Sequence, residues 1–357
     1  MASVLYRAAG MPAMQNRLYQ SRRDAMAAPA AVLELVQDDS GVVVNQRFDQ
    51  GLVCYDQSYQ NDQGFSPHFR RHLEAVTRYC SAHLSDPHAL IVDVGCGKGG
   101  FVELLRGQGL NAVGYDNAYQ GDSPYIRRSC FDGRSHEQGD LLTLRHVLEH
   151  IPSPWPFLVS LAEANGGRGL LYIEVPDLDW ILENRAYFDL FHEHVNYFRA
   201  DDFRRCFGDA LIDLSTSFGG QYLSVVLSLE RLSHCRPNSS QPEPELLGRF
   251  GSLVEHESRS YAALNDASSI VLWGAAAKGV VFAAKASPTL QRRMAYAIDI
   301  NPSKQGHFMP ISGLEVLNPV DGMARLSSAI PVVIMNPNYE HEIRDALPPN
   351  HPCMLLH

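Results

Sequence analysis

Short apolar runs alternate with amphipathic segments in the middle of the chain, from Ala89 to about Leu229. Four of these runs have the length and composition of buried strands, namely ALIVDVG, NAVGYD, DLLTLRHV and GLLYIEVP. Strands that alternate with helices indicate a parallel sheet. Two alternating runs around Gly219 and Gly220 then predict a β-hairpin. This segment is therefore expected to form a parallel α/β sheet that ends in a hairpin.

The last third of the chain repeats this pattern on a smaller scale, in SIVLWGAAAKGVVFAAKA, MAYAIDINP and PVVIMNPNY. A polar, proline-containing stretch, SHCRPNSSQPEPE, precedes it and is typical of a linker or exposed loop, with a charged helix expected after it. The N-terminal residues are mixed, with strand-like VLELV and GVVVN and a helical pattern from Pro67 to His83. We predict an α/β protein with a small N-terminal module (1–66), a central Rossmann-like domain (67–232) and a second Rossmann-like domain (243–357).

Composition narrows the classes of function. The formal net charge of −10 argues against a general nucleic-acid binder, which needs a basic surface. No apolar run approaches the roughly 20 residues that cross a bilayer, and the N-terminus has no secretory apolar segment, so we expect a cytoplasmic protein that does not bind membranes. The seven cysteines form no CxxC pair, which indicates neither a disulfide framework nor a zinc site.

The stretch IVDVGCGKGGF runs from a strand through a glycine-rich turn into a helix. Glycines let a backbone approach a ligand closely, and ligands of such sheets lie beyond the carboxyl ends of the strands. Asp93 precedes the glycines, and Asp116 ends the next strand, where a carboxylate can hold the ribose hydroxyls of an adenosine. Nicotinamide binding and a turn without a ligand are the alternatives.

This loop, together with GYD, resembles the cofactor loop of class I S-adenosylmethionine-dependent methyltransferases. The resemblance implies S-adenosylmethionine as the cofactor and also accounts for the terminal hairpin. The cofactor-binding residues that it implies are Asp93, Gly95, Cys96, Gly97, Asp116, Asn117, Phe131 and His146.

Further motifs resemble, in order, the bacterial C-methyltransferases of nucleotide deoxysugars: LRHVLEHIPSPWPFL, YIEVPDLDWI, FDLFHEHVNYF, FGGQYLSVV, GAAAKG and IDINPSKQG. That family has a zinc-binding N-terminal domain, a central methyltransferase domain and a C-terminal Rossmann-like domain. Here Gln37 and Ser40 stand where the family has cysteines, so we expect the N-terminal module to fold without zinc. Phe191 stands where the sugar enzymes have tyrosine, which leaves the acceptor open.

Histidine and glutamate in DLFHEHVNYF suit either a metal site or proton transfer. The metalloprotease spacing is HExxH, whereas His192 and His194 are only two residues apart, and the sequence offers no obvious third ligand. We therefore predict no metal, so that the protein should purify without zinc. Proton transfer is favoured because the segment follows the strand LLYIEVP, at the rim where methyl acceptors lie.

Methylation of a carbon beside a ketone requires a base that removes a C–H proton. Glu193, His194 and His150 are our candidates for that step, the alternative for each histidine being a hydrogen-bonded wall residue. By resemblance Tyr59 adds a hydroxyl over the acceptor, with Tyr55 as the competing candidate and a plain packing tyrosine as the alternative to both.

The GAAAKG turn of the last domain precedes a helix whose exposed N–H groups suit an anion. By resemblance Lys278, Asn301 and Lys304 contact a phosphate or another anionic group of the substrate, and His192 belongs to the same substrate-binding set. A helix packed closely on its strand through alanines is the alternative.

The leading expectation is C-methylation of a keto-sugar nucleotide or a similarly activated keto compound. O- or N-methylation of a natural-product or glycan precursor is the alternative, and a non-catalytic S-adenosylmethionine-binding protein is a remote one. The expected partner is a small-molecule acceptor, and the chain is expected to be a monomer or a homodimer.

Overall fold

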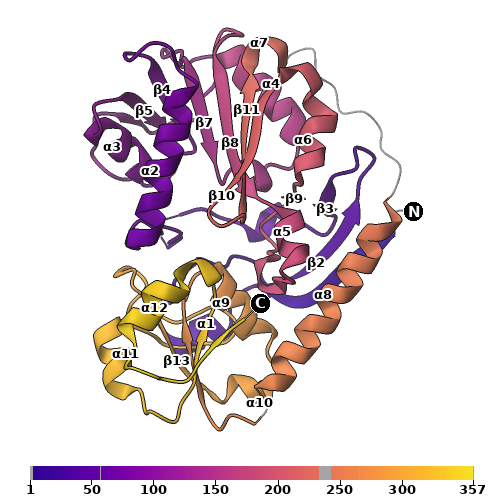
Figure 1. The fold of residues 1–357 in the computed structure, drawn as a ribbon, viewed down its shortest axis with the longest axis vertical. Helices are drawn as coiled ribbons and strands as arrows, with labels where there is room; N and C mark the ends of the chain where they lie inside the picture. Colours follow the sequence, from indigo (N-terminus) through magenta and orange to yellow (C-terminus); the bar gives the residue numbers. More distant parts are fainter. Residues whose placement is uncertain (1–2, 57, 233–242, 265, 357) are drawn as a thin grey trace.

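The computed structural model describes residues 3–56, 58–232, 243–264 and 266–356. Figure 1 shows a large sheet in the upper part of the molecule and a smaller α/β unit below it, with a long helix along one side. Most of the predicted linker, residues 233–242, lies outside the described residues.

The central sheet has seven strands in the order β10-β11-β8-β7-β4-β5-β6. The pairs among β4 to β8 are parallel, and β11 is antiparallel to both β8 and β10. This confirms the predicted parallel sheet with its terminal hairpin, and the short strand β6 is an addition. The strands are β4 (Leu90–Val94), β5 (Asn111–Tyr115), β6 (Ile126–Arg127), β7 (Leu141–Arg145), β8 (Leu170–Pro176), β10 (Leu211–Ser217) and β11 (Tyr222–Ser228).

Helices cover both faces of this sheet (Figure 1). The first of them, α2, starts where Ser66 accepts a hydrogen bond from the backbone of Phe69 and where Pro67 occupies the first turn. Its buried positions, among them Phe69, Leu73 and Val76, follow helical spacing and pack on the sheet. The helices are α2 (Pro67–Ala82), α3 (Gly100–Gly107), α4 (Pro154–Ala164), α5 (Leu178–Glu183), α6 (Ala200–Phe207) and α7 (Leu229–Leu232), with 3₁₀ turns η2 (Leu148–His150), η3 (Tyr187–Asp189) and η4 (Gly208–Ala210).

The N-terminal segment forms a four-stranded antiparallel sheet in the order β1-β2-β3-β9. Its last strand comes from the central segment, directly after the FHEH stretch. The N-terminal sheet therefore holds that stretch in place from one side. The elements are β1 (Val4–Pro12), α1 (Arg22–Met26), β2 (Ala30–Gln37), β3 (Val43–Asn45), η1 (Gln50–Leu52) and β9 (Asn196–Tyr197).

The C-terminal sheet has five parallel strands in the order β14-β13-β12-β15-β16. This is the second α/β sheet that the sequence predicts. Its elements are α8 (Pro244–Ala263), β12 (Ile270–Trp273), α9 (Ala277–Lys285), α10 (Pro288–Gln291), β13 (Met294–Ile298), β14 (Val316–Leu317), α11 (Pro319–Arg325), β15 (Val332–Ile334), η5 (Pro337–Tyr339), α12 (Glu340–Ala346) and β16 (Cys353–Leu355).

One hydrophobic core joins the N-terminal sheet to the C-terminal unit. It brings together Leu33 of β2, Ile181 of α5 and Phe250 of α8, all buried. Residues far apart in the chain thus share one core. The division into domains at 1–66, 67–232 and 243–357 remains a prediction.

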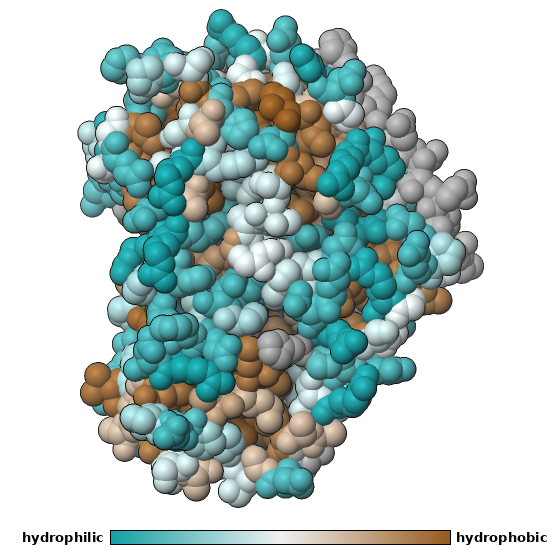
Figure 2. Space-filling model, viewed as in Figure 1, coloured by the Kyte–Doolittle hydropathy of each residue, from teal (hydrophilic) through white to brown (hydrophobic). Residues whose placement is uncertain are grey.

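The outer surface is mixed. Figure 2 shows hydrophobic residues scattered among hydrophilic ones on the face that it draws. Among the described residues, no helix combines the length and the apolar character needed to span a membrane.

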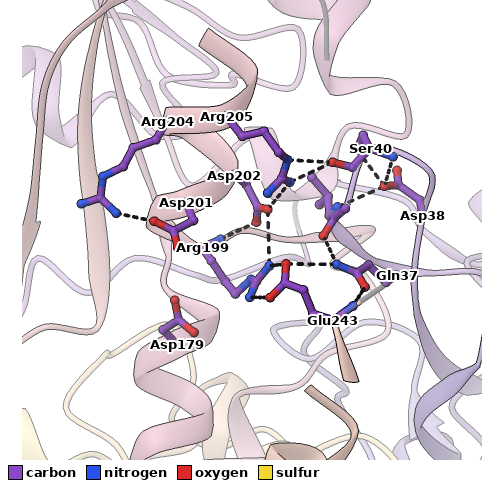
Figure 3. Close-up of polar contacts among 12 residues, drawn as sticks. Gln37, Asp38, Ser40, Asp179, Arg199, Asp201, Asp202, Arg204, Arg205 and Glu243 are labelled. Carbon is purple, nitrogen blue, oxygen red and sulfur yellow. Dashed lines mark hydrogen bonds and ion pairs between the residues drawn. The ribbon is translucent and has the colours of Figure 1, made fainter. Parts of the chain in front are cut away.

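Hydrogen bonds and ion pairs surround Gln37 and Ser40, the residues for which the resemblance implied lost zinc ligands (Figure 3). The Gln37 side chain donates to Gly41 O at 2.9 Å, and its Oε1 accepts from the backbone N–H of Glu243 at 2.9 Å. Arg199 forms two hydrogen bonds with the Glu243 carboxylate, at 2.7 and 2.6 Å. The backbone oxygen of Ser40 accepts from Arg205 at 2.8 Å. Polar contacts thus connect this turn to α6 and to the start of α8.

Candidate active site

A cavity of about 900 Å³ lies where the three segments meet. Its walls come from the carboxyl ends of β4, β7 and β8 on one side and of β12 and β13 on the other. Sequence-predicted residues that line it are Tyr59, Asp93, Gly95, Cys96, Gly97, His146, His150, Glu193, His194, Lys278, Asn301 and Lys304. The cavity thus brings together predicted cofactor, catalytic and substrate residues.

The glycine loop forms one end of this cavity. Gly95 has a φ of 72°, and a Cβ there would lie 2.6 Å from a methyl group of Val147. Gly97 has a φ of 56° with open space beside it, and its N–H donates to Asp116 Oδ2 at 2.8 Å. The loop therefore needs glycine for its backbone and presents a bare surface to a ligand.

Asp93 lies beneath this loop at the end of β4. It accepts a hydrogen bond from Thr143 Oγ1 at 2.7 Å, and burial raises the pKa of its carboxyl to about 6. Three of the predicted cofactor residues do not line the cavity, namely Asp116, Asn117 and Phe131. Asn117 is exposed. Asp116 is half-buried at the end of β5, and Phe131 packs edge-on against Tyr115, with ring centroids 5.1 Å apart. The structure therefore places Phe131 in the core behind the rim.

His146 belongs to a buried ionic network next to the loop. Its Nε2 lies 3.2 Å from Glu174 Oε1, and its Nδ1 lies 3.5 Å from Glu149 Oε1. Burial opposes the charged imidazole, but these two carboxylates outweigh it and raise the pKa of His146 to about 9. Arg145 contacts the same Glu174 at 2.8 Å. Sequence reasoning missed Glu174, although a carboxylate within the apolar run LLYIEVP is itself a signal.

Glu193 projects into the cavity from the turn after η3. Tyr59 donates its hydroxyl to Glu193 Oε2 at 3.0 Å, and the backbone N–H of Gln15 donates to Oε1 at 3.2 Å. Burial raises the pKa of Glu193, and His150 and these donors oppose that rise. A buried carboxyl with a raised pKa suits a proton acceptor.

His150 and His194 lie edge to face, with ring centroids 4.8 Å apart. His150 Nδ1 is 3.0 Å from the backbone oxygen of Glu193 and 2.9 Å from the hydroxyl of Tyr55. Burial, followed by the electrostatic effect of the neighbouring His150, lowers the pKa of His194 well below its usual value. Both tyrosine candidates therefore contact this cluster, Tyr59 through Glu193 and Tyr55 through His150, but only Tyr59 is among the lining residues.

His192 is not among the residues that line the cavity. Its Nδ1 lies 3.0 Å from the backbone oxygen of Val32, and its ring stacks on Phe48. The turn sends His192 toward the N-terminal sheet and its two successors toward the cavity. Phe191 does line the cavity, edge-on to His194.

Two lysines stand at the far end of the cavity. Lys278, at the start of α9, is paired with Asp189. Lys304 is buried and donates to Asn16 Oδ1 at 3.2 Å and to Ala275 O at 3.3 Å. Within the described ranges it forms no ion pair, and burial lowers its pKa. Asn301 donates to the backbone oxygen of Asp62 at 3.1 Å.

Glu149 is a lining residue that sequence reasoning did not name. With His150 and His194 it forms a group whose possible metal-ligand atoms all lie within 4.8 Å of one another. The argument against a metal considered His192 and His194, which point apart. The third ligand comes from a different strand end, so its place near His194 is a tertiary property.

Comparison with known proteins identifies the central segment. Residues 67–210 match the family model described as "Methyltransferase domain". The C-methyltransferase NovU of Streptomyces niveus is 30% identical over 122 residues, which are 30% of this chain and 29% of that protein. The match thus spans less than a third of the curated relative.

Among solved structures, the chain shows weak similarity to further methyltransferases. They include CalO1, a methyltransferase in calicheamicin biosynthesis (17% identity, 44% of this chain and 53% of that chain, TM-score 0.35), and the plantazolicin methyltransferase BpumL (14% identity, 47% and 86%, TM-score 0.38). The match to a methyltransferase domain falls on residues 67–210, which include β4 to β8 of the central sheet.

Proposed function

We propose that this protein is an S-adenosylmethionine-dependent methyltransferase that methylates a carbon next to a carbonyl group, in a keto-sugar nucleotide or a similarly activated keto compound. The observation that carries this proposal is that Glu193, with its raised pKa, faces the same cavity as the glycine loop. One cavity thus offers a cofactor site and a proton acceptor.

The proposed cofactor, S-adenosylmethionine, is based on the loop after β4. Its glycines leave room for the ligand, and Asp116 stands at the end of β5, where a carboxylate reaches ribose hydroxyls. CalO1 was crystallised with S-adenosylhomocysteine, the product of such a transfer. The match to a methyltransferase domain favours the same cofactor here.

The chemistry needs little beyond positioning and one proton transfer. The base takes the acidic C–H proton, and the resulting enolate carbon attacks the methyl group of the sulfonium. The C–S bond breaks, and its electron pair stays on sulfur, which gives S-adenosylhomocysteine. Glu193 is our first candidate for the base, with Tyr59 hydrogen-bonded to it, and His150 and His194 border the same space.

The proposed type of acceptor is based on the wall that the C-terminal unit contributes to the cavity. Lys304 is a buried cation without an ion-pair partner among the described residues, and the start of α9 lies beside it. Such a wall favours an acceptor with an anionic group, such as a nucleotide diphosphate.

Hydrogen exchange tests the proposal before any methyl is transferred. A candidate keto-sugar nucleotide, incubated with enzyme and S-adenosylhomocysteine in D₂O, should take up deuterium at the carbon to be methylated. Glu193→Gln should slow this exchange by roughly a hundredfold or more, the usual scale of general base catalysis. Glu163→Gln, at an exposed position on α4, is the matched control and should exchange normally.

Three results would contradict the proposal, each in a different part. An acceptor that is methylated without exchange would favour an oxygen or nitrogen nucleophile. Phe191, which replaces the tyrosine of the sugar enzymes, leaves that alternative open. Exchange that survives Glu193→Gln, His194→Ala and His150→Ala would mean that the base lies elsewhere. Cofactor binding without turnover on any acceptor would favour a non-catalytic binding protein.

A further inference from the structure

Three metal-binding side chains meet in the wall between the glycine loop and Glu193. Glu149 and His150 belong to η2, directly after β7, and His194 follows β8 and η3. Their possible ligand atoms all lie within 4.8 Å of one another, and all three line the cavity.

Glu149 supplies the first independent reason to expect a ligand here. Its side chain is 2% exposed, and Oε2 has no hydrogen-bond partner among the described residues. The other oxygen, Oε1, lies 3.5 Å from His146 Nδ1. A buried carboxylate oxygen without a partner is costly, so a native structure needs a reason for it. A cation bound at Oε2 would be one.

The tautomer of His150 supplies the second reason. The backbone oxygen of Glu193, 3.0 Å from Nδ1, can only accept a hydrogen bond, so this contact requires a proton on Nδ1. The Tyr55 hydroxyl, 2.9 Å from the same nitrogen, can accept from it as well. In this tautomer the lone pair is on Nε2. This is the arrangement of metal-binding histidines, whose second nitrogen usually donates to a carbonyl or carboxylate.

His194 completes the set. It is buried against Phe191 and His150, and among the described residues no hydrogen bond engages its imidazole nitrogens. The nearby cation, Lys278, is paired with Asp189, so its charge is already compensated.

We propose that Glu149, His150 and His194 bind one first-row divalent cation of the Zn²⁺, Fe²⁺ or Co²⁺ class. Two imidazole nitrogens and one carboxylate oxygen suit these ions, whereas Mg²⁺ and Ca²⁺ prefer oxygen ligands. Bonds of about 2.1 Å require ligand atoms about 3.4 Å apart, so atoms now up to 4.8 Å apart must approach by as much as about 1.4 Å on binding. Three protein ligands leave a coordination position open toward the cavity.

The role of this ion rests on the proposed function. Bound to the acceptor's carbonyl oxygen, it would stabilise the negative charge of the enolate as a Lewis acid. His150 and His194 then act as ligands, and Glu193 alone receives the C–H proton. This proposal departs from the sequence-based expectation of a metal-free protein.

Cobalt binding to the chelator-treated full chain tests the site without cofactor or acceptor. Titration with Co²⁺, followed by calorimetry and visible absorption, should give one ion per chain with d–d bands, and Zn²⁺ should displace it. Glu149→Gln and His194→Ala should each weaken binding at least about tenfold. His88→Ala, at an exposed histidine, is the matched control and should bind normally. Binding of S-adenosylhomocysteine shows that each variant is folded.

The outcomes separate this proposal from the proposed function. Absence of stoichiometric Co²⁺ and Zn²⁺ binding, or binding unchanged in both variants, overturns the metal site, and exchange or methylation that persists in chelator would then still support the methyltransferase. A bound ion lost in both variants supports the site even if no keto acceptor is ever methylated. Exchange abolished by chelator and restored by Co²⁺ supports both.

Discussion

Asp116 is the residue whose substitution tests the cofactor most directly. Its Oδ2 accepts from Gly97 N at 2.8 Å and its Oδ1 from Ala118 N at 2.8 Å, so it also orders the glycine loop. Asp116→Ala should weaken the binding of S-adenosylhomocysteine by roughly 1.5–3 kcal/mol, because a charged hydrogen-bonding partner is lost. Calorimetry measures this, with fully exposed Asp122→Ala as the control. Tight NAD binding by the wild type would contradict the assignment.

Asp177 predicts a pH dependence of stability. It caps α5, and burial raises the pKa of its carboxyl to about 7, above the unfolded value of about 3.9. The folded state therefore holds this proton more tightly, and the contribution of Asp177 to stability is greatest below the unfolded pKa and declines until the pH passes about 7. Asp177→Asn should remove that decline and raise the free energy of unfolding above pH 7 by roughly 1–3 kcal/mol. Urea titrations across the pH range measure it, and an unchanged pH profile would contradict the burial argument.

At the scale of elements, two glycines of one turn have separable roles. Gly99, the N-cap of α3, has a φ of 81°, and a Cβ there would lie 2.0 Å from Ile126 Cδ1. Gly99→Ala should therefore cost roughly 2–3 kcal/mol of stability. Gly97 has a φ of 56° and open space beside it, so Gly97→Ala should cost only about 1–2 kcal/mol.

Gly99→Ala should lose more stability than Gly97→Ala, whereas Gly97→Ala should lose more affinity for S-adenosylhomocysteine. Gly97 lines the cavity, so a methyl group there should clash with the proposed cofactor and weaken S-adenosylhomocysteine binding at least about tenfold. Thermal unfolding and calorimetry on both variants make the comparison. If both variants, measured at a temperature where each is folded, lost the same affinity, Gly97 would not face the cofactor.

At the scale of the whole molecule, Arg199 and Glu243 connect the central segment to the long helix α8 (Figure 3). The Arg199 side chain is 6% exposed and that of Glu243 is 33% exposed. Glu243→Ala leaves a buried guanidinium with a weaker partner, Asp202 at 3.7 Å, and should cost about 1–3 kcal/mol. Arg204→Ala breaks only an exposed pair with Asp201 and should cost under about 1 kcal/mol.

Denaturant unfolding compares these two variants. The double substitution Arg199→Met with Glu243→Ala should be less destabilising than the sum of the single ones, since no uncompensated charge remains. Strict additivity would show that the two side chains do not stabilise each other.

Local patterns were sufficient for much of this molecule. The four central strands, the hairpin at Gly219 and Gly220, and the smaller α/β unit all follow from periodicity and turn residues. The strand β1 was not predicted, because its buried positions do not alternate regularly and its pairing with β2 shifts register twice. Strand β9 has two residues and exists only through pairing with β3, which no local pattern specifies.

The glycine loop and Asp116 were identifiable in the sequence because each depends on a strand, a turn and a helix that are close neighbours in the chain. The proposed catalytic residues depend on segments that are distant in the chain. Tyr59 contacts Glu193 across 134 positions, and His150 contacts the Glu193 backbone across 43. Sequence spacing says nothing about such meetings, since they arise from sheet order and from the N-terminal sheet that receives β9. For that reason His192, adjacent to Glu193 in the chain, lies outside the cavity, while Glu149 lies inside it.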